Sequence, residues 1–315
     1  MSSLTAPRKG TVEGIPRRRL HDWRKPRWFV PLLFSGGALA VVLVMTIFPF
    51  FNTLILSFTD ATMLRPGHFT GIDNFVQLWG DARFTRALFN STLYVFCVVP
   101  FMVVLPLILA SVSAGDGKFM GFFRTSFYLP VVMGAVAGGL IWTNLLDSRG
   151  LVNGVLSWLN VISEPVPFLT DRWLILISAM VVTVWMGMGY YMVIYLAALA
   201  NIDTTLYDAA SVDGAGPVRR FISVTMPGVR NTMALIAMFS SVAAFRVFSE
   251  VYILTDSSGG PGGNAMTMTM LIQREGTGLQ AQTGYAGAIS LVMFAILAVL
   301  LALQLTVQNR QEKDA

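Results

Sequence analysis

The sequence is poor in the residues that build catalytic and metal sites. Its 315 residues include one cysteine, Cys97, and two histidines, His21 and His68. A single cysteine excludes a disulfide framework and a cysteine-based metal site within the chain. No Ser-His-Asp set and no zinc-like spacing stands out. We therefore expect no enzyme, with no catalytic residue, no metal site and no cofactor bound by this chain.

Charge is also scarce. Charged residues make up 12% of the chain and hydrophobic residues 55%, whereas soluble domains carry about 25% charged residues. A phosphate-binding loop of the form G-x-x-x-x-G-K-[ST] is missing: Gly117-Lys118-Phe119 lacks both the first glycine and the hydroxyl residue. The composition indicates a membrane protein, and any work driven by ATP would need another subunit to hydrolyse it.

Long apolar runs define the predicted fold. Each run is long enough for a helix to cross about 30 Å of hydrocarbon, and none alternates with the period of two typical of barrel strands. The runs are Trp28–Thr59, Ala87–Gly115, Thr125–Leu146, Trp173–Ile202, Asn231–Phe245 continuing to Leu254, and Gly284–Asn309. We predict an all-α integral membrane protein with six transmembrane helices. Its parts are a basic tail (1–27), a transmembrane domain (28–308) and a short tail (309–315).

The distribution of basic residues predicts the orientation. Lys and Arg number 15 in segments 1–27, 113–125, 200–231 and 308–315, against six in segments 59–87, 147–172 and 254–284. The positive-inside rule places the first group, and with it both termini, in the cytoplasm. The basic tail could bind nucleic acid, but just before a membrane span it more simply holds anionic lipid head groups. We expect a multi-pass protein of the cell membrane with lipid, and no nucleic acid, as a partner.

A polar segment, Tyr207–Asn231, interrupts the apolar runs. A short helix through Asp208 can turn at Asp213-Gly214, where glycine accepts a positive φ. A second helix can start at Pro217, whose fixed φ suits a first helical position, and end before Pro227. The pattern predicts a compact helix-turn-helix on the cytoplasmic side, between the fourth and fifth spans.

The residues of this segment resemble a known family. Asp208-Ala209-Ala210, Asp213-Gly214-Ala215, Phe221, Val224 and Met226-Pro227 resemble the EAA loop of ABC-type importer permeases, in particular the sugar-uptake, maltose-type permeases. Asp208 replaces the usual Glu, Met226 the usual Leu, and Asn231 a common second Pro. The resemblance implies a coupling loop, at about 200–231, that docks on an ATPase subunit. It assigns that role to Tyr207, Asp208, Ala209, Ala210, Asp213, Gly214, Ala215, Phe221 and Pro227.

The resemblance extends over residues 30 to 308. Gly71–Phe75, Phe122–Thr125, Gly139–Trp142 and Tyr252–Thr255 resemble the corresponding stretches of sugar permeases. It implies one membrane subunit of an ATP-driven carbohydrate importer that works by alternating access. The implied partners are a second homologous permease, two copies of an ATP-binding subunit that hold ATP and Mg, and an extracytoplasmic solute-binding protein.

Candidate residues of the substrate path come from two sources. Arg246 and Glu250 are charges at membrane depth, four residues apart, which either line a wet path or pair and orient the helix. Aromatic faces stack on sugar rings while hydroxyl groups bond to the sugar. On that basis the resemblance carries over Thr183, Trp185, Gly187 and Tyr190 in the fourth span and Ser240 in the fifth. The alternative role for these residues is helix packing or an interfacial aromatic belt.

Two other functions remain open from the residues. The same importer class could carry a glycerol phosphodiester or an amino sugar, with Arg246 serving a phosphate group. A stand-alone secondary transporter would need inverted repeats or an array of intramembrane carboxylates, and Glu250 is a single one.

Overall fold

The structure is a computed structural model that describes residues 29–115 and 117–313. The basic tail predicted for residues 1–27 lies outside the described residues. The chain divides into two compact units, one up to Phe51 and one from Asn52 onward. The first unit is helical: α1 (Phe29–Val42), the π-helical stretch η1 (Leu43–Ile47) and the beginning of α2 (Phe48–Leu56) follow one another without interruption.

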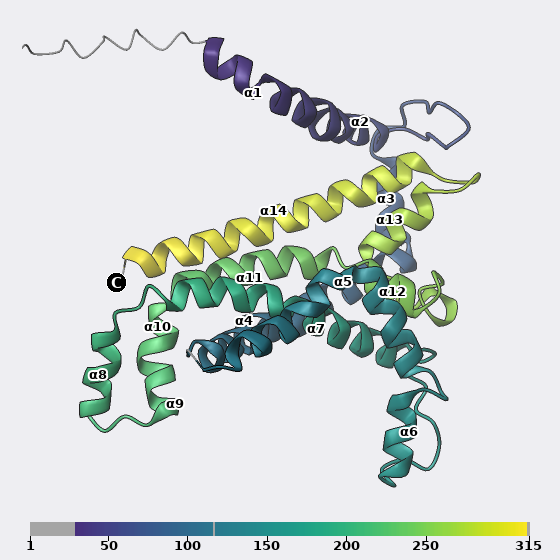
Figure 1. Cartoon of the computed structure of the whole chain (residues 1–315). Coiled ribbons are helices and arrows are strands. Elements are labelled where there is room, and N and C mark those ends of the chain that lie inside the picture. The colour runs from purple at the N-terminus through teal and green to yellow at the C-terminus, as the bar shows by residue number, and fades with distance from the viewer. Residues whose placement is uncertain (1–28, 116, 314–315) are drawn as a thin grey trace, which may run out of the picture. The chain divides into compact units, whose positions relative to one another are not determined.

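The second unit is also helical (Figure 1). Beyond one isolated bridge between Thr59 and Phe69, its described residues form no β-structure. After α2 its elements are α3 (Asp73–Gly80), α4 (Ala82–Ser113), α5 (Met120–Leu146), α6 (Leu151–Trp158), α7 (Arg172–Leu199), α8 (Thr204–Val212), α9 (Pro217–Arg220), the π-helix η2 (Phe221–Thr225), α10 (Met226–Gly228), α11 (Arg230–Phe245), α12 (Ser249–Leu254), the 3₁₀ turn η3 (Pro261–Gly263), α13 (Met268–Gly276) and α14 (Thr283–Lys313). The all-α prediction is confirmed.

The described residues include five helical stretches that are long and apolar enough to cross a membrane. They are Ser35–Leu56, Ala82–Ser113, Met120–Trp158, Arg172–Leu199 and Thr283–Arg310. The predicted fifth span, Asn231–Leu254, is different. α11 has 16 residues, about 24 Å of helix, and the backbone leaves helical geometry at Arg246–Phe248 before α12 begins. The segment Pro217–Gly228 joins α11 at an angle of 73°.

α5 is interrupted as well. Gly134 has φ 77° and ψ 163° inside it, a conformation that essentially only glycine adopts. Pro130, four residues earlier, lacks the backbone donor for the carbonyl of residue 126 and weakens the turn that precedes the break. The third predicted span therefore consists of two helical pieces that meet at Gly134.

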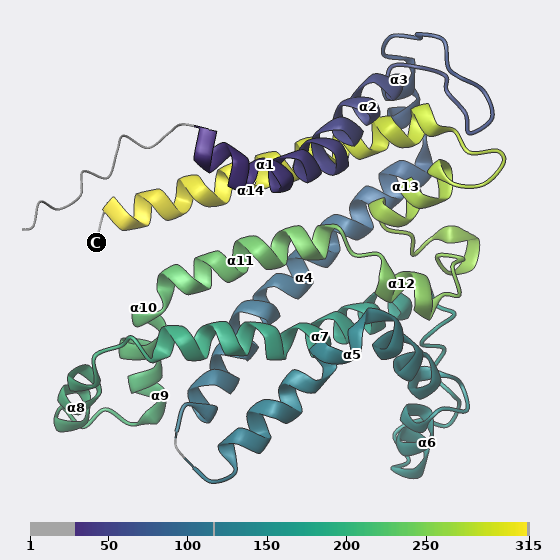
Figure 2. The ribbon, with the colours of Figure 1, turned by 45° about the horizontal axis from the view of Figure 1, so that its top comes forward.

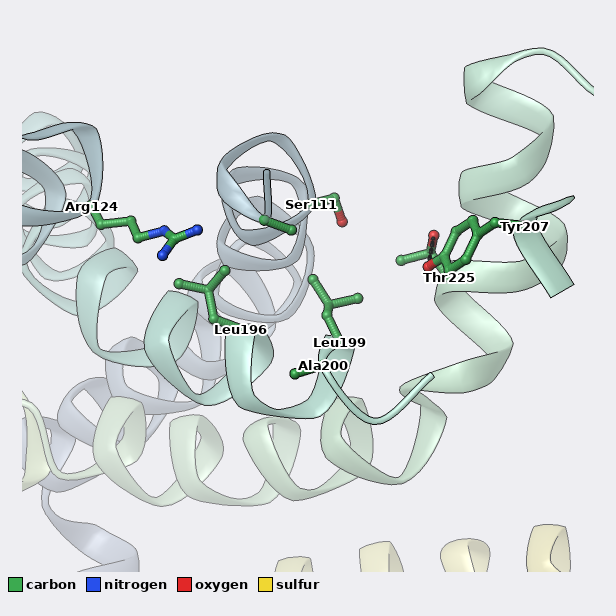
Figure 3. A pocket seen from close by; sticks show the side chains of 8 residues that line it. Ser111, Arg124, Leu196, Leu199, Ala200, Tyr207 and Thr225 are labelled. Atoms are coloured by element: carbon green, nitrogen blue, oxygen red, sulfur yellow. Dashed lines mark hydrogen bonds between the residues drawn. The ribbon is translucent and has the colours of Figure 1, made fainter. Parts of the chain in front are cut away.

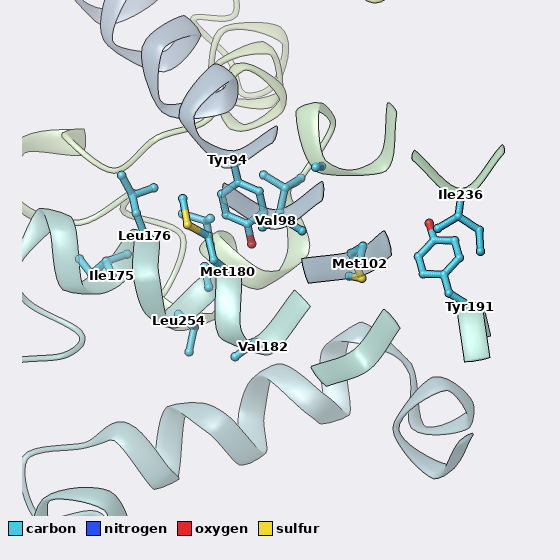
Figure 4. Close-up of a cluster of buried hydrophobic side chains, with 14 of the residues drawn as sticks. Tyr94, Val98, Met102, Ile175, Leu176, Met180, Val182, Tyr191, Ile236 and Leu254 are labelled. Atoms are coloured by element: carbon cyan, nitrogen blue, oxygen red, sulfur yellow. The ribbon is translucent and has the colours of Figure 1, made fainter. Parts of the chain in front are cut away.

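α7 is the central helix of the second unit. It packs between α4 and α5, and α4 packs on its other side against α11 (Figure 2). Close approach depends on glycine: a Cβ at Gly189 would lie 2.2 Å from the carbonyl oxygen of Phe127 in α5. The main core, with Tyr94, Met192 and Ile236 fully buried, lies between these helices (Figure 4). Burial of this apolar surface between helices fixes their relative positions.

A second, smaller core joins α3, α4, α13 and α14 through Leu78, Phe84, Leu271 and Tyr285. Asp81 caps α4 beside it, accepting a hydrogen bond from the Arg83 backbone N–H at 2.8 Å. Its carboxylate also accepts from the Tyr285 hydroxyl at 2.7 Å, and Arg83 pairs with Glu275 of α13. Burial acts to raise the pKa of Asp81, but hydrogen bonds from Arg83 and Tyr285 outweigh it and leave that pKa below its usual value.

Candidate functional site

The helix-turn-helix segment, residues 203–228, projects from the unit between α7 and α11 (Figure 1). Asp203 starts it: its carboxylate accepts the Thr205 backbone N–H at 2.9 Å and caps α8. That backbone hydrogen bond lowers the pKa of Asp203. At the turn, Gly214 has φ +72° and the Ala215 N–H donates to the Ala210 carbonyl at 2.9 Å. The predicted turn at Asp213-Gly214 and the helix start at Pro217 are present.

Three ties hold the two legs of the segment together. At its base, Gly228 lies so near Ile202 that a Cβ would be 2.7 Å from the Ile202 Cδ1 atom. In the middle, the Tyr207 and Thr225 hydroxyls are hydrogen-bonded at 3.0 Å. Near the tip, Arg220 donates to the Ser211 hydroxyl at 3.0 Å.

The ties give the hairpin a fixed shape. Ser211 in turn donates to the Tyr207 carbonyl at 2.7 Å, which connects the tie near the tip to the one in the middle. All three ties join the leg that leaves α7 to the leg that enters α11. The segment therefore connects the end of α7 to the start of α11 through side-chain contacts as well as through its backbone.

The outer surface of the segment combines carboxylates with apolar side chains. Asp208, Ala209, Asp213, Gly214 and Pro227 are exposed, whereas Ala210, Ala215 and Phe221 are half-buried. Four large apolar side chains are exposed beside them: Leu206, Val212, Val218 and Ile222. Apolar groups in contact with water on a polar segment are typical of a protein interaction site, and the sequence analysis did not single out these four.

Tyr207 differs from its predicted neighbours. It is half-buried and lines a cavity of about 510 Å³ that separates the segment from the ends of α4 and α7 and the first turns of α5 (Figure 3). Arg124 borders the same cavity and donates to the Ser113 carbonyl at 2.9 Å, which ties α5 to the last turn of α4. The side chain of Tyr207 faces inward to Thr225, which is 4% exposed.

The seven candidates for the substrate path lie in different surroundings. Thr183 is hydrogen-bonded to the Tyr94 hydroxyl at 2.6 Å, and the Glu250 carboxyl group lies near both residues. Trp185 packs edge-to-face on Trp142 of α5 at 5.8 Å. Tyr94, at 0% exposure, was missed from the sequence because nothing in its neighbourhood sets it apart from other apolar stretches. Trp142 was noted only as part of the stretch Gly139–Trp142, not as a contact of the path.

Two of the candidates have packing roles in the structure. A Cβ at Gly187 would lie 2.5 Å from the Met102 Cε atom, so this glycine makes room for α4. Ser240 is 2% exposed and donates to the Ile236 carbonyl of its own helix at 2.7 Å. Tyr190, by contrast, is 49% exposed.

The two intramembrane charges do not share a helical face. Arg246 ends α11 and Glu250 follows the break in α12, so the helical spacing assumed from the sequence does not apply. No ion pair joins them among the described residues. Arg246 is exposed, which at membrane depth calls for a wet cavity or a neighbouring subunit.

Comparison with known proteins decides the family. The family described as "Binding-protein-dependent transport system inner membrane component" matches residues 80–313. The chain belongs to this family. It is 32% identical over 274 residues to the lactose transport system permease protein LacF of Rhizobium radiobacter, covering 86% of this chain and 91% of that relative. It is 30% identical to the diacetylchitobiose uptake system permease protein NgcF of Streptomyces coelicolor, covering 94% and 86%.

Solved structures show the same fold. A bacterial ABC transporter involved in the import of the acidic polysaccharide alginate superposes with a TM-score of 0.77 at 22% identity, covering 90% of this chain and 96% of that one. A second structure, of the alginate transporter in complex with a periplasmic protein that holds an alginate pentasaccharide, gives a TM-score of 0.74 at 23% identity. The family's description as an inner membrane component, with the apolar helices, makes this chain a multi-pass membrane protein. The predicted membership of the sugar-uptake ABC importer permeases is confirmed.

Proposed function

We propose that this chain is one permease subunit of an ATP-driven importer for a carbohydrate, with both termini in the cytoplasm. The observation that carries the proposal is the exposed helix-turn-helix segment, which joins α7 directly to α11. Relatives named for lactose and diacetylchitobiose support the carbohydrate class. The alternatives, a phosphodiester cargo or a self-contained transporter, have no comparable support.

The partners follow from the same geometry. A separate ATPase dimer holds ATP and Mg, and its closing pushes or pulls the exposed face around Asp208. Because three ties fix the hairpin, the movement is passed to α7 and α11 and not lost in bending. A second permease covers the exposed intramembrane side chains, and a solute-binding protein delivers the cargo on the opposite side. The access of the path then alternates between the two sides.

Within the path, the side chains best placed to meet solute are Arg246 and Tyr190, which are exposed at membrane depth. Thr183, hydrogen-bonded to Tyr94, and the nearby Glu250 form a polar cluster between α4, α7 and α12 that can reorganise when α12 moves.

Charge reversal at Asp208 tests the docking role. Lysine suits a helix as well as aspartate does, so Asp208→Lys should leave the chain folded and inserted while removing the match to a cationic partner. We expect solute uptake to fall at least tenfold and stimulation of the ATPase by the binding protein to disappear. Glu164→Lys, an exposed carboxylate in the loop after α6, is the matched control. Normal uptake in Asp208→Lys would remove the docking role.

The whole assignment is tested by co-purifying the chain with the products of neighbouring genes in lipid nanodiscs. ATP hydrolysis is measured with and without the candidate binding protein, across a panel of sugars. Stimulation by one loaded binding protein names the substrate. A chain that purifies with no ATPase subunit would contradict the importer assignment.

A further inference from the structure

A continuous apolar groove runs along α4, α11 and α14. One cavity of about 500 Å³ lies between α11 and α14 and continues into a second of about 360 Å³, because Leu300 and Gln304 line both. The walls are mostly aliphatic or aromatic, with Ala234, Met238 and Leu303 in the first cavity. The second reaches Val95 and Phe96 of α4.

One end of the groove is polar. Arg230, the first residue of α11, lines the first cavity at the end of the unit that carries the helix-turn-helix segment. It is exposed, and among the described residues no carboxylate pairs with it. Gln308 lines the same cavity, and its Oε1 atom is buried without a hydrogen-bond partner.

Gln304, one turn away from Gln308, donates to the Ser241 hydroxyl at 2.8 Å, and its own Oε1 atom has no partner. Unsatisfied amide oxygens cost free energy in an apolar setting. A ligand that brings a donor to this end of the groove would recover part of that cost.

The groove changes from a cation and an amide at one end to a mostly apolar channel at the other, and this change matches an amphiphile. A transmembrane helix is about 10–12 Å across and would lie over a groove of this volume without filling it or reaching the amides. We propose that the groove holds one anionic phospholipid. Its phosphate accepts hydrogen bonds from Arg230, a hydroxyl of its head group bonds a Gln308 side chain that turns toward it, and one acyl chain lies between α11 and α14. A juxtamembrane arginine favours anionic over neutral lipid.

The site lies beside the joint between the helix-turn-helix segment and α11. Arg230 directly follows the buried Val229, at the 73° bend that enters α11. An occupied groove would support the first turns of α11 at that bend. The proposal concerns the chain's own surface and does not depend on which solute is carried or on the ATPase subunit.

The test is native mass spectrometry of the full chain, delipidated in detergent and titrated with phosphatidylglycerol or with phosphatidylcholine of the same acyl chains. We expect one phosphatidylglycerol to bind at least fivefold more tightly than phosphatidylcholine. Arg230→Gln should abolish that preference, while Arg219→Gln, an exposed arginine of the helix-turn-helix segment outside the groove, should keep it. Equal behaviour of the two variants would overturn the proposal.

Two further variants examine the occupant itself. Ala234→Phe places a ring in the channel and should remove binding of both lipids; should this variant fail to fold, the pair at Arg230 and Arg219 still decides. A benzoyl-phenylalanine at position 303, irradiated in native membranes, should carry a lipid-sized adduct. A cross-link to another polypeptide as the main product would show that a protein covers the groove, and would overturn the lipid assignment.

Discussion

The hydrogen bond between Tyr207 and Thr225 offers a sharp test of how the helix-turn-helix segment works. It connects α8 to η2 at 3.0 Å, and Thr225 is 4% exposed, so water does not easily replace the lost partner. Tyr207→Phe removes one hydroxyl and keeps the ring. An intramolecular hydrogen bond contributes about 1 kcal/mol net, so the hairpin should open about fivefold more often.

Two measurements report this opening. Hydrogen exchange at the backbone amides of α8 should accelerate about fivefold in the purified full chain, because exchange from a locally opened state follows its population. In the reconstituted importer, more ATP should be hydrolysed for each solute transported, since a looser hairpin passes on less of the movement. Binding of the ATPase subunit should stay unchanged, because the side chain of Tyr207 faces inward.

The control is Ser223→Ala. Ser223 lies in the same segment and donates only to the Arg219 carbonyl one turn earlier, so its loss removes a hydroxyl without untying the legs. Thr225→Val should reproduce the effect of Tyr207→Phe, and the double variant should add little to either. Additive effects, or exchange at the wild-type rate in Tyr207→Phe, would refute the idea of a tied hairpin. Weaker ATPase binding in Tyr207→Phe alone would support the docking role that the sequence predicted for Tyr207.

Three further variants probe the fold, each by thermal unfolding of the full chain in detergent. Gly189→Ala should lower the free energy of unfolding by roughly 1–3 kcal/mol, since its Cβ would meet the Phe127 carbonyl. Gly154→Ala in α6 has open space and should stabilise slightly, because alanine is the better helix former. A loss of equal size in the two variants would refute the close α5–α7 contact. Gly134→Ala should cost about 1–3 kcal/mol because φ is +77°, and no loss would mean that the break is not rigid. The pKa of Asp81 is lower in the folded state than its usual value. The stabilisation that its ionised form contributes is therefore present above its usual pKa and is lost as pH falls through the folded pKa. Asp81→Asn should remove that acid dependence, and an unchanged pH profile would contradict it.

The sequence by itself determined most of the helical architecture. Apolar runs of about 20 residues can form little other than membrane helices. The polar segment between the fourth and fifth runs contains glycine and proline, whose effect on the backbone is local. Gly214 and Pro217 fix a turn and a helix start through their own backbone preferences, and these need no partner from elsewhere in the chain. The same reasoning missed α6 and α13, which lie in loops that are too short and mixed in composition for a clear period.

The contacts between the two legs of the hairpin could have been predicted from the sequence, but they were not. Once the turn is centred near Ala215 and Gly216, residues at equal distances on either side face each other. Ile202 with Gly228, Tyr207 with Thr225, and Ser211 with Arg220 are such pairs. Hydroxyl groups at equal numbers of residues before and after a predicted turn therefore indicate a hydrogen bond across the hairpin.

Only the tertiary structure decided what the membrane side chains do. The same residue types serve packing or solute contact according to what lies opposite, and that is set by helices distant in the chain. Gly187 faces Met102, and Ser240 bonds to its own backbone. The break at Arg246–Phe248 separates two charges that helical spacing would bring together. Local preference specifies where a helix starts and ends, whereas the contacts across its faces are fixed by the packing of the whole domain.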